Sequence, residues 1–207
     1  MSTTSASRVP QEERTRAMRL RLMEATVELL VEKGFSGTTT TLVSERAGVS
    51  RGAQLHHFPT KNALAVAAVT HLTEIRGAEL AAAAARLPGG KNRTAAVTTM
   101  LGDHFTSPVF TAALELWVAA RTDAGLQEAV APLEQRLGRE THRLTVQLLG
   151  IDDSDPEARA LVQATLDLMR GLGLANTLGD DASRRRRILK QWARTLDSAL
   201  VSRKADT

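Results

Sequence analysis

The four-residue segment Ala47–Ser50, AGVS, constrains the fold more than any other part of the sequence. It lies between two short stretches whose apolar residues recur with a helical period. Ala47 is small enough for two helices to cross closely, Gly48 adopts a positive φ without a Cβ penalty, and Ser50 is placed to cap the following helix. Two helices joined by such a turn form a helix-turn-helix.

The whole chain has the pattern of an all-α protein. Aromatic residues make up 3% of it, tyrosine is absent and alternating β-branched runs are scarce. Gly34 is placed to end the first helix, while Thr38 or Thr39 can cap the second and Thr60 the fourth. We predict an N-terminal three-helix domain at residues 14–61 and a C-terminal helical domain of about six helices at residues 62–207. The long helices are expected at Lys61–Leu87, Asn92–Thr106, Pro108–Thr122, Gly125–Leu149, Pro156–Leu178 and Ala182–Arg203.

The composition excludes several classes of protein. The 207 residues include no cysteine, which excludes disulfides, thiol catalysis and cysteine-based zinc sites. No apolar run approaches the roughly 20 residues that span a bilayer, and the first dozen residues lack the apolar centre of a secretion signal. We therefore expect a cytoplasmic protein with no membrane partner and a short frayed N-terminus.

The charge is unevenly distributed along the chain. Residues 1–61 carry nine basic and six acidic side chains, whereas residues 62–207 carry 18 and 17. The N-terminal part is therefore the more basic one, which gives weak support for a polyanionic partner.

The sequence gives little support for an enzyme. It contains no nucleotide-binding loop and no HExxH motif, so an active site would have to use Glu115, His104 or His142 as acid or base. His56 and His57 are adjacent, and adjacent residues on a helix point about 100° apart, so the two cannot chelate one metal together. We expect no catalytic residue, no metal site and no cofactor.

Three stretches around the turn carry a family resemblance: ATVELLVEKGF (25–35), TTTTLVSERAGVSRGA (38–53) and HHFPTKNAL (56–64). In helix lengths and spacings they resemble the N-terminal domain of the tetracycline-repressor (TetR) family. The resemblance implies a dimeric transcription regulator, usually a repressor, that binds a palindromic double-stranded DNA operator. It also implies that the C-terminal helices hold a pocket for a small-molecule effector that releases the DNA, and that the last two helices form the homodimer interface.

The resemblance also implies a set of DNA-binding positions. Arg51 is the candidate for a bidentate contact to guanine. His57 and Lys61 match phosphate-contacting positions, where the N-terminus of the following helix adds partial positive charge. The full set comprises Thr40, Thr41, Arg51, Gly52, Ala53, Gln54, Leu55, His57 and Lys61.

The sequence departs from the family pattern at Gln54 and Leu55, where the family usually has an apolar residue followed by tyrosine. The phosphate contact of that tyrosine is therefore missing. Gln54 either points outward and reads adenine or sits half-buried with its amide bonded to a carbonyl, and both alternatives stay open here. The departure also leaves a second hypothesis for function, a helical dimeric protein-interaction module whose helix-turn-helix is non-functional.

The C-terminal helices carry weaker signals. An effector pocket is expected between the helix Lys61–Leu87 and the helices after it, although the sequence favours a simple packing role for the aromatic residues there. The run Arg184–Arg187 is interpreted as a solvated surface, with Asp180 and Asp181 partly offsetting its charge. The candidate pocket residues are Met100, His104, Phe105, Phe110, Trp117, Arg121 and His142.

Overall fold

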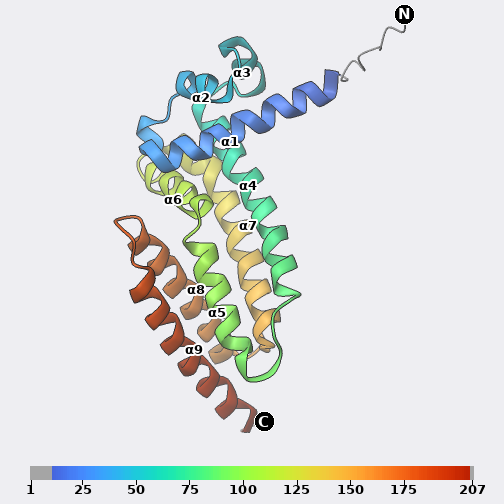
Figure 1. Ribbon diagram of the computed structural model, residues 1–207, viewed down its shortest axis with the longest axis vertical. Helices are drawn as coiled ribbons and strands as arrows, with labels where there is room; N and C mark the ends of the chain where they lie inside the picture. The colour runs from blue at the N-terminus through green and yellow to red at the C-terminus, as the bar shows by residue number, and fades with distance from the viewer. Residues whose placement is uncertain (1–10, 206–207) are drawn as a thin grey trace, which may run out of the picture.

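The computed structural model describes residues 11–205, which form nine α-helices, one short 3-10 helix and no β-strand (Figure 1). The all-α prediction is confirmed, whereas the predicted frayed N-terminus lies outside the described residues. Within the described part, no helix is both long and apolar enough to cross a membrane. The elements are α1 (Gln11–Gly37), α2 (Thr40–Ala47), α3 (Arg51–His57), α4 (Lys61–Ala84), the 3-10 helix η1 (Gly90–Asn92), α5 (Arg93–Phe105), α6 (Pro108–Ala120), α7 (Ala124–Leu149), α8 (Pro156–Asn176) and α9 (Ala182–Ala205).

The molecule is elongated, with α2 and α3 at one end and the C-terminus of α9 at the other (Figure 1). Helix α1 packs against α2, α4 and α6, and the long helices α4 and α7 run side by side along the molecule. Helix α5 packs against α8 and α9 in the opposite half. The two halves are thus joined chiefly by α4, α6 and α7.

Helix α1 is interrupted at Gly34, as the sequence predicts. The residue has a φ of 67° and a ψ of 176°, a conformation that is essentially restricted to glycine. The ψ differs from that of the expected left-handed cap, and the chain makes a further short turn to Gly37 before α2 begins. The hydroxyl of Thr38 donates to the carbonyl of Gly34 at 2.8 Å and closes this turn.

Hydroxyl caps start the next three helices at the predicted positions. Thr39, rather than Thr38, caps α2 by accepting a hydrogen bond from the backbone N–H of Leu42 at 3.2 Å. Ser50 caps α3, and Thr60 caps α4 through the backbone N–H of Ala63 at 3.0 Å. These contacts satisfy N–H groups that have no partner inside the helix, so the helix boundaries are determined locally.

The C-terminal helices end within three residues of their predicted limits. One cap differs from the sequence pattern. The spacing of Ser154 and Glu157 predicts a capping box, but Asp155 is the N-cap of α8 and accepts from the backbone N–H of Glu157 at 3.0 Å. Ser154 instead donates its hydroxyl to Asp152 at 2.7 Å, because the loop bends back at this point.

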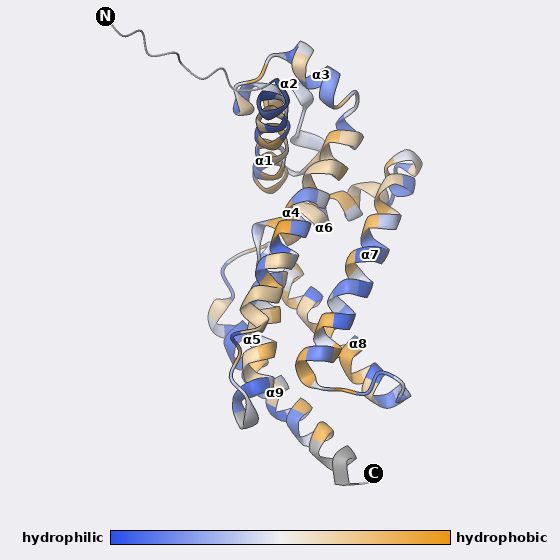
Figure 2. Ribbon diagram, turned by 90° about the vertical axis from the view of Figure 1, so that its right-hand side faces the viewer, coloured by the Kyte–Doolittle hydropathy of each residue, from blue (hydrophilic) through white to orange (hydrophobic). Residues whose placement is uncertain are grey.

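The buried apolar side chains form two clusters. The first joins α1–α4 to α6 and the first half of α7, and it includes Leu22, Leu30 and Leu116. The second joins α5, the end of α7, α8 and α9, and it includes Leu101 and Met169. Figure 2 shows hydrophobic residues recurring along α5, α6 and α8. The first cluster extends beyond residue 62, and the domain division at that residue stays a prediction.

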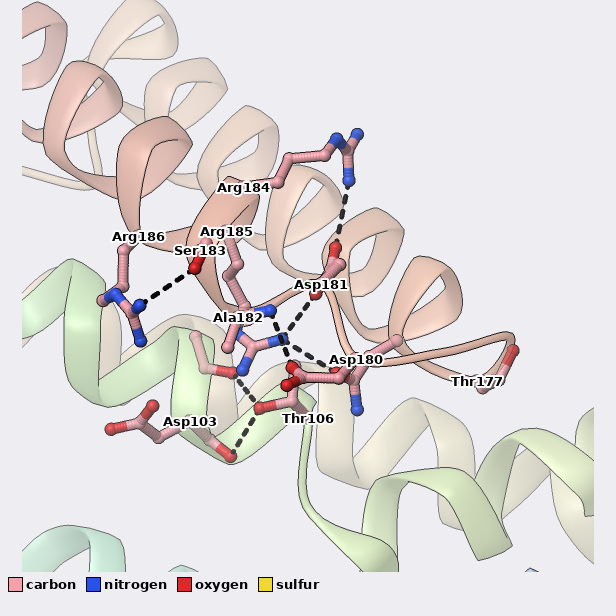
Figure 3. Close-up of polar contacts among 12 residues, drawn as sticks. Asp103, Thr106, Thr177, Asp180, Asp181, Ala182, Ser183, Arg184, Arg185 and Arg186 are labelled. Carbon is pink, nitrogen blue, oxygen red and sulfur yellow. Dashed lines mark hydrogen bonds and ion pairs between the residues drawn. The ribbon is translucent and has the colours of Figure 1, made fainter.

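The charge of the arginine run at the start of α9 is partly offset by its neighbours (Figure 3). Asp181 accepts from Arg184 at 3.0 Å and from Arg185 at 2.6 Å, while Arg186 donates to the hydroxyl of Ser183 at 3.1 Å. Asp180 accepts from the backbone N–H of Ala182. The carboxylates therefore offset cations that the helix dipole disfavours at this end, as expected from the sequence.

Candidate functional site

The turn between α2 and α3 has the predicted geometry. Gly48 is left-handed, with φ 61° and ψ 39°, and its N–H donates to the carbonyl of Glu45 at 3.2 Å. The N–H of Val49 donates to the carbonyl of Ser44 at 3.0 Å, and the Val49 side chain is buried in the first apolar cluster. The hydroxyl of Ser50 accepts from the N–H of Ala53 at 3.3 Å. The turn therefore fixes the direction in which α3 leaves the protein.

Helix α3 has an inner and an outer face. Gln54 and Phe58, one turn apart, are 0% and 3% exposed and hold the helix against the core. Ala53 is half-buried at the boundary. Because α3 lies at the end of the molecule (Figures 1 and 2), its outer face is open to a large partner. This face presents Arg51, Gly52, Leu55 and His56, all exposed.

The expectation that Gln54 belongs to the DNA-binding set is corrected. The amide nitrogen of Gln54 donates to the carbonyl of Phe58 at 2.7 Å, and the side chain is completely buried. Of the two alternatives, the inward orientation is therefore the one observed. The physical reason is that position 54 falls on the inner face of α3, where the buried amide satisfies a carbonyl at the helix end.

The two threonines of α2 differ in exposure. Thr41 is exposed in the first turn of α2, whereas Thr40 is half-buried and its carbonyl accepts from the hydroxyl of Ser44 at 2.9 Å. Thr41 is therefore the threonine whose side chain is open to a partner.

The two predicted phosphate contacts flank the start of α4. Burial, together with the charges of His56 and Arg19, lowers the pKa of His57, so its ring is mainly neutral at pH 7. Burial also lowers the pKa of Lys61, and its ammonium lies 4.0 Å from the ring centroid of Phe35. That contact holds the cation beside the N–H groups that begin α4, where an anion is favoured.

Two arginines of this end were not singled out by the sequence pattern. The guanidinium of Arg19 in α1 lies 4.5 Å from the ring centroid of Phe58 and so stands beside α3. Arg46 is held by Glu28 at 3.1 Å and by Glu32 at 2.8 Å. Arg19 is thus an additional candidate for phosphate contact, whereas Arg46 already has two carboxylate partners. No sequence motif distinguishes these two roles, because they depend on which helices pack together.

A cavity of about 400 Å³ lies among α4, α5, α6, α7 and α8. This volume is within the range of about 300–1,000 Å³ that is typical of small-molecule sites. Four of the predicted pocket residues line it: His104, Phe105, Phe110 and Trp117. The structure adds residues from the helices on either side, including Thr73, Gly77, Leu137, Thr141, Leu144 and Arg170. The recurrence of Leu137, Thr141 and Leu144 along one face of α7 is the sequence signal that could have identified this wall.

The aromatic side chains form a continuous wall of the cavity. Phe105 and Phe110 meet edge to face with centroids 5.2 Å apart, and Phe110 and Trp117 do so at 5.8 Å. Burial, reinforced by the charge of Arg76, lowers the pKa of His104, so the cavity presents a neutral imidazole at pH 7. The site therefore combines an apolar wall with a few polar groups.

The other three predicted pocket residues lie outside the cavity lining. Met100 lines a separate groove between α4 and α5. His142 lies near α8, where its Nε2 is 2.8 Å from Asp153 Oδ1. Arg121 is exposed at the end of α6, because the four-residue spacing from Trp117 brings it past the end of the cavity.

The comparisons with known proteins agree with this geometry. The profile of the family described as bacterial regulatory proteins, tetR family, matches residues 22–68, from the middle of α1 into α4. The HTH-type transcriptional regulator CymR of Pseudomonas putida is 31% identical over 193 residues, which cover 89% of this chain and 91% of CymR. The chain belongs to the TetR family of bacterial regulatory proteins.

Solved structures share the fold of this TetR-family protein. A putative transcriptional regulator from Pseudomonas aeruginosa PAO1 is 25% identical, with a TM-score of 0.71 over 95% of this chain and 96% of its own. The regulator FadR from Bacillus subtilis, solved in complex with stearoyl-CoA, is 12% identical, with a TM-score of 0.64 over 86% of this chain and 96% of its own. The resemblance stated from the sequence is confirmed, and the protein is a transcriptional regulator.

A long-range hydrogen bond links α6 to the interrupted end of α1 in this TetR-family regulator. Glu115 of α6 accepts a hydrogen bond from the backbone N–H of Phe35 at 3.1 Å, across 80 residues of sequence. The ring of Phe35 in turn contacts Lys61, and α6 lines the cavity through Trp117. The sequence singled out Glu115 only as a possible acid or base of an enzyme. Its position gives α6 a contact with the cavity on one side and with the interrupted end of α1 on the other.

Proposed function

We propose that the protein is a dimeric repressor that binds a palindromic operator through α3 and is released by a small-molecule effector. The observation that supports this most directly is the outer face of α3. A short helix with a buried inner face and a capped N-terminus presents Arg51 and its neighbours at the end of the molecule. This is the arrangement in which a recognition helix enters the major groove.

The side chains around α3 suit distinct parts of a DNA duplex. Arg51 is fully available for a bidentate contact to guanine, which discriminates by about 1–3 kcal/mol. Thr41 of α2, His57 at the end of α3 and Lys61 at the start of α4 suit phosphate contacts, which determine register and orientation. His57 acts there as a neutral hydrogen-bond donor, and Lys61 supplies the charge.

A dimer follows from the shortness of the recognition helix. One seven-residue helix reads too few base pairs for tight and specific binding, whereas two related by a two-fold axis reach half-sites about 34–36 Å apart. Helix α8 supports such an interface through Leu174, which is 57% exposed, and Leu178 just beyond its end is 95% exposed. The exposed small residues Ala160, Ala164 and Gly171 continue this surface along α8.

The cavity supports control by an effector. FadR, which has the same fold, is described in complex with stearoyl-CoA, so this architecture accommodates small ligands in at least one relative. In the present chain, Thr73 and Gly77 of α4 line the cavity about three to four turns away from Lys61 on the same helix. A ligand that tilts α4 would change the spacing of the two recognition helices, and its binding and DNA binding would then oppose each other reciprocally.

Selection of bound duplexes from a random pool tests DNA binding. We expect a palindrome whose half-sites contain a guanine, and we expect Arg51→Ala to lose about 1–3 kcal/mol of preference for that guanine. Arg187→Ala, an exposed arginine of α9, is the matched control and leaves the preference unchanged. Equal binding of Arg51→Ala and wild type to selected and random duplexes, with the same salt dependence, would rule out sequence reading by α3.

Sedimentation or light scattering tests the dimer. Leu174→Arg places a charge on the proposed interface and should shift the protein toward monomer. Val118→Arg on α6 is the matched control, because Val118 is 60% exposed and lies on another surface. A Leu174→Arg protein that remains as dimeric as Val118→Arg contradicts an interface through α8.

One observation favours the second hypothesis, a protein-interaction module. Leu55 is an exposed apolar residue on α3 where the family usually has tyrosine. If the random pool yields no enriched duplex while the dimer persists, α3 serves a protein partner instead of DNA.

A further inference from the structure

Leu55 is an unusual side chain for its position. It is 43% exposed, and it is the one large apolar residue exposed on α3 in the described structure. It belongs to neither apolar cluster of the described residues. Leu55 therefore contributes little to the core of this chain, and its role depends on what the outer face of α3 contacts.

The spacing on α3 directs Leu55 toward the same partner as Arg51. The two residues are four positions apart, so they lie on one face, one above the other. Gln54 and Phe58 point into the core, which fixes the rotation of α3 about its axis. A duplex that receives Arg51 in its major groove therefore also meets Leu55.

The major groove offers one apolar group that suits a leucine. Guanine, cytosine and adenine present donors and acceptors there, whereas thymine also presents its C5-methyl group. Leucine cannot donate a hydrogen bond to a phosphate or to a base edge. Contact with a methyl group removes apolar surface of both partners from water, which is the favourable interaction available to this side chain.

We propose that Leu55 is a specificity residue that reads the C5-methyl group of a thymine in each half-site. This inference rests on the proposed function, DNA binding through α3. One turn of helix separates Leu55 from Arg51, about 5.4 Å along the helix, and successive bases are about 3.4 Å apart. The thymine therefore lies one or two base pairs from the guanine contacted by Arg51.

Deoxyuridine scanning of the selected operator tests the proposal. Replacing one thymine at a time with deoxyuridine removes only the methyl group, and the dissociation constant is measured at fixed salt concentration. For the wild-type protein, we expect a loss of about threefold to tenfold at one position per half-site, as for one buried methyl group. For Leu55→Ala, the same replacement should change affinity less than twofold.

Two variants separate this contact from other effects. Leu55→Met keeps an apolar side chain and should keep the deoxyuridine effect, which also shows that substitution at this exposed position leaves the fold intact. Arg51→Ala should lose the guanine preference and keep the deoxyuridine effect. Loss of only the guanine preference in Arg51→Ala, and of only the deoxyuridine effect in Leu55→Ala, supports independent reading by Arg51 and Leu55.

Three outcomes overturn the inference. The first is wild-type binding to a selected operator with no position sensitive to deoxyuridine. The second is a sensitive position that costs wild type and Leu55→Ala equally, which assigns the methyl group to another residue. The third is a failure of wild type to bind any duplex, which overturns the proposed function as well and leaves a protein partner for the outer face of α3. The first two outcomes leave DNA binding intact, so a failure of the Leu55 inference is distinguishable from a failure of the proposed function.

Discussion

The two ends of the molecule are specified by different kinds of information. At the end that holds α2 and α3, short-range chemistry sets each boundary: Thr39, Ser50 and Thr60 cap three successive helices, and Gly48 makes the turn. At the other end, long helices are positioned by how their faces pack. There, contacts between residues far apart in sequence decide which side chains meet.

This difference indicates which parts of the protein accept changes in sequence without losing their structure. A hydroxyl cap or a glycine turn has few substitutes, so the end that holds α2 and α3 keeps a recognisable sequence. A packed helix face accepts many combinations of apolar residues of similar total volume. The cavity can therefore change its lining while the helices around it keep their arrangement.

The largest expected effect tests how strictly the inner face of α3 is specified. Gln54→Glu replaces a buried donor with a carboxylate that faces the carbonyl of Phe58, so it removes the 2.7 Å hydrogen bond and buries an unpaired charge. We expect a loss of about 3–5 kcal/mol in the free energy of unfolding, measured by urea denaturation. Gln54→Leu keeps the volume without charge but leaves the Phe58 carbonyl unpaired, so it should cost about 1–3 kcal/mol, less than Gln54→Glu. If both variants are equally stable, the inward position of Gln54 is wrong.

The next effect tests packing at the opposite end. A Cβ at Gly173 of α8 would collide with the backbone carbonyl of Phe105 and come within 2.5 Å of Phe110 Cε1. Gly173→Ala should therefore cost about 1–3 kcal/mol or more, as overpacking does, measured by denaturant unfolding.

Gly77 of α4 provides the control for Gly173, because a Cβ there meets no atom within 4 Å. Gly77→Ala should be neutral or stabilising by up to about 1 kcal/mol, from helix propensity alone. Equal stability of the two alanine variants would show that α5, α6 and α8 do not approach each other as closely as described.

The comparison between Gly34 and Gly173 also shows what the sequence could predict. Gly34 follows a helical apolar stripe and precedes a run of threonines, so its positive φ was predictable from local order. Gly173 lies inside a helical pattern, GLGLAN, and nothing nearby signals that Phe105 packs against it. Helix limits, caps and the turn were predictable for the same reason as Gly34, because they depend on neighbours in sequence.

In the candidate sites too, features set by neighbours in sequence were predictable, whereas features set by tertiary packing were not. The sequence identified the aromatic wall of the cavity, because large apolar side chains mark a helix interior. It missed Arg170 and the α7 wall and included Arg121 and His142, because which helix faces the cavity is a tertiary property. Gln54 was left open for the related reason that the rotation of α3 is set by burial of Phe58.

A third effect tests the contact between α6 and the interrupted end of α1. Gly34 occupies a conformation restricted to glycine, and a Cβ there would lie 2.8 Å from Glu115 Oε2. Gly34→Ala should cost about 1–3 kcal/mol from backbone strain and should also disturb the hydrogen bond from Phe35 to Glu115. Thermal unfolding of Gly34→Ala, Glu115→Ala and the double variant separates the cost of the backbone strain from the cost of the lost hydrogen bond. A double variant as unstable as the sum of the single variants contradicts coupling between these residues.

The smallest effect concerns pH and the cavity. Burial, with the charge of Arg76, lowers the pKa of His104 below its ordinary value of 6.5. The folded protein thus holds His104 neutral, and the unfolded chain takes up a proton first as the pH falls. The contribution of neutral His104 to the free energy of unfolding is complete above about pH 6.5. It declines as the pH falls from there toward the lower pKa of the folded protein, because the unfolded state binds more protons over that pH range. His104→Gln removes this titration, so its unfolding free energy relative to wild type should be constant above pH 6.5 and improve below it. An NMR titration in which the His104 ring protonates at or above its ordinary pKa would show that the cavity presents a charged rather than a neutral imidazole.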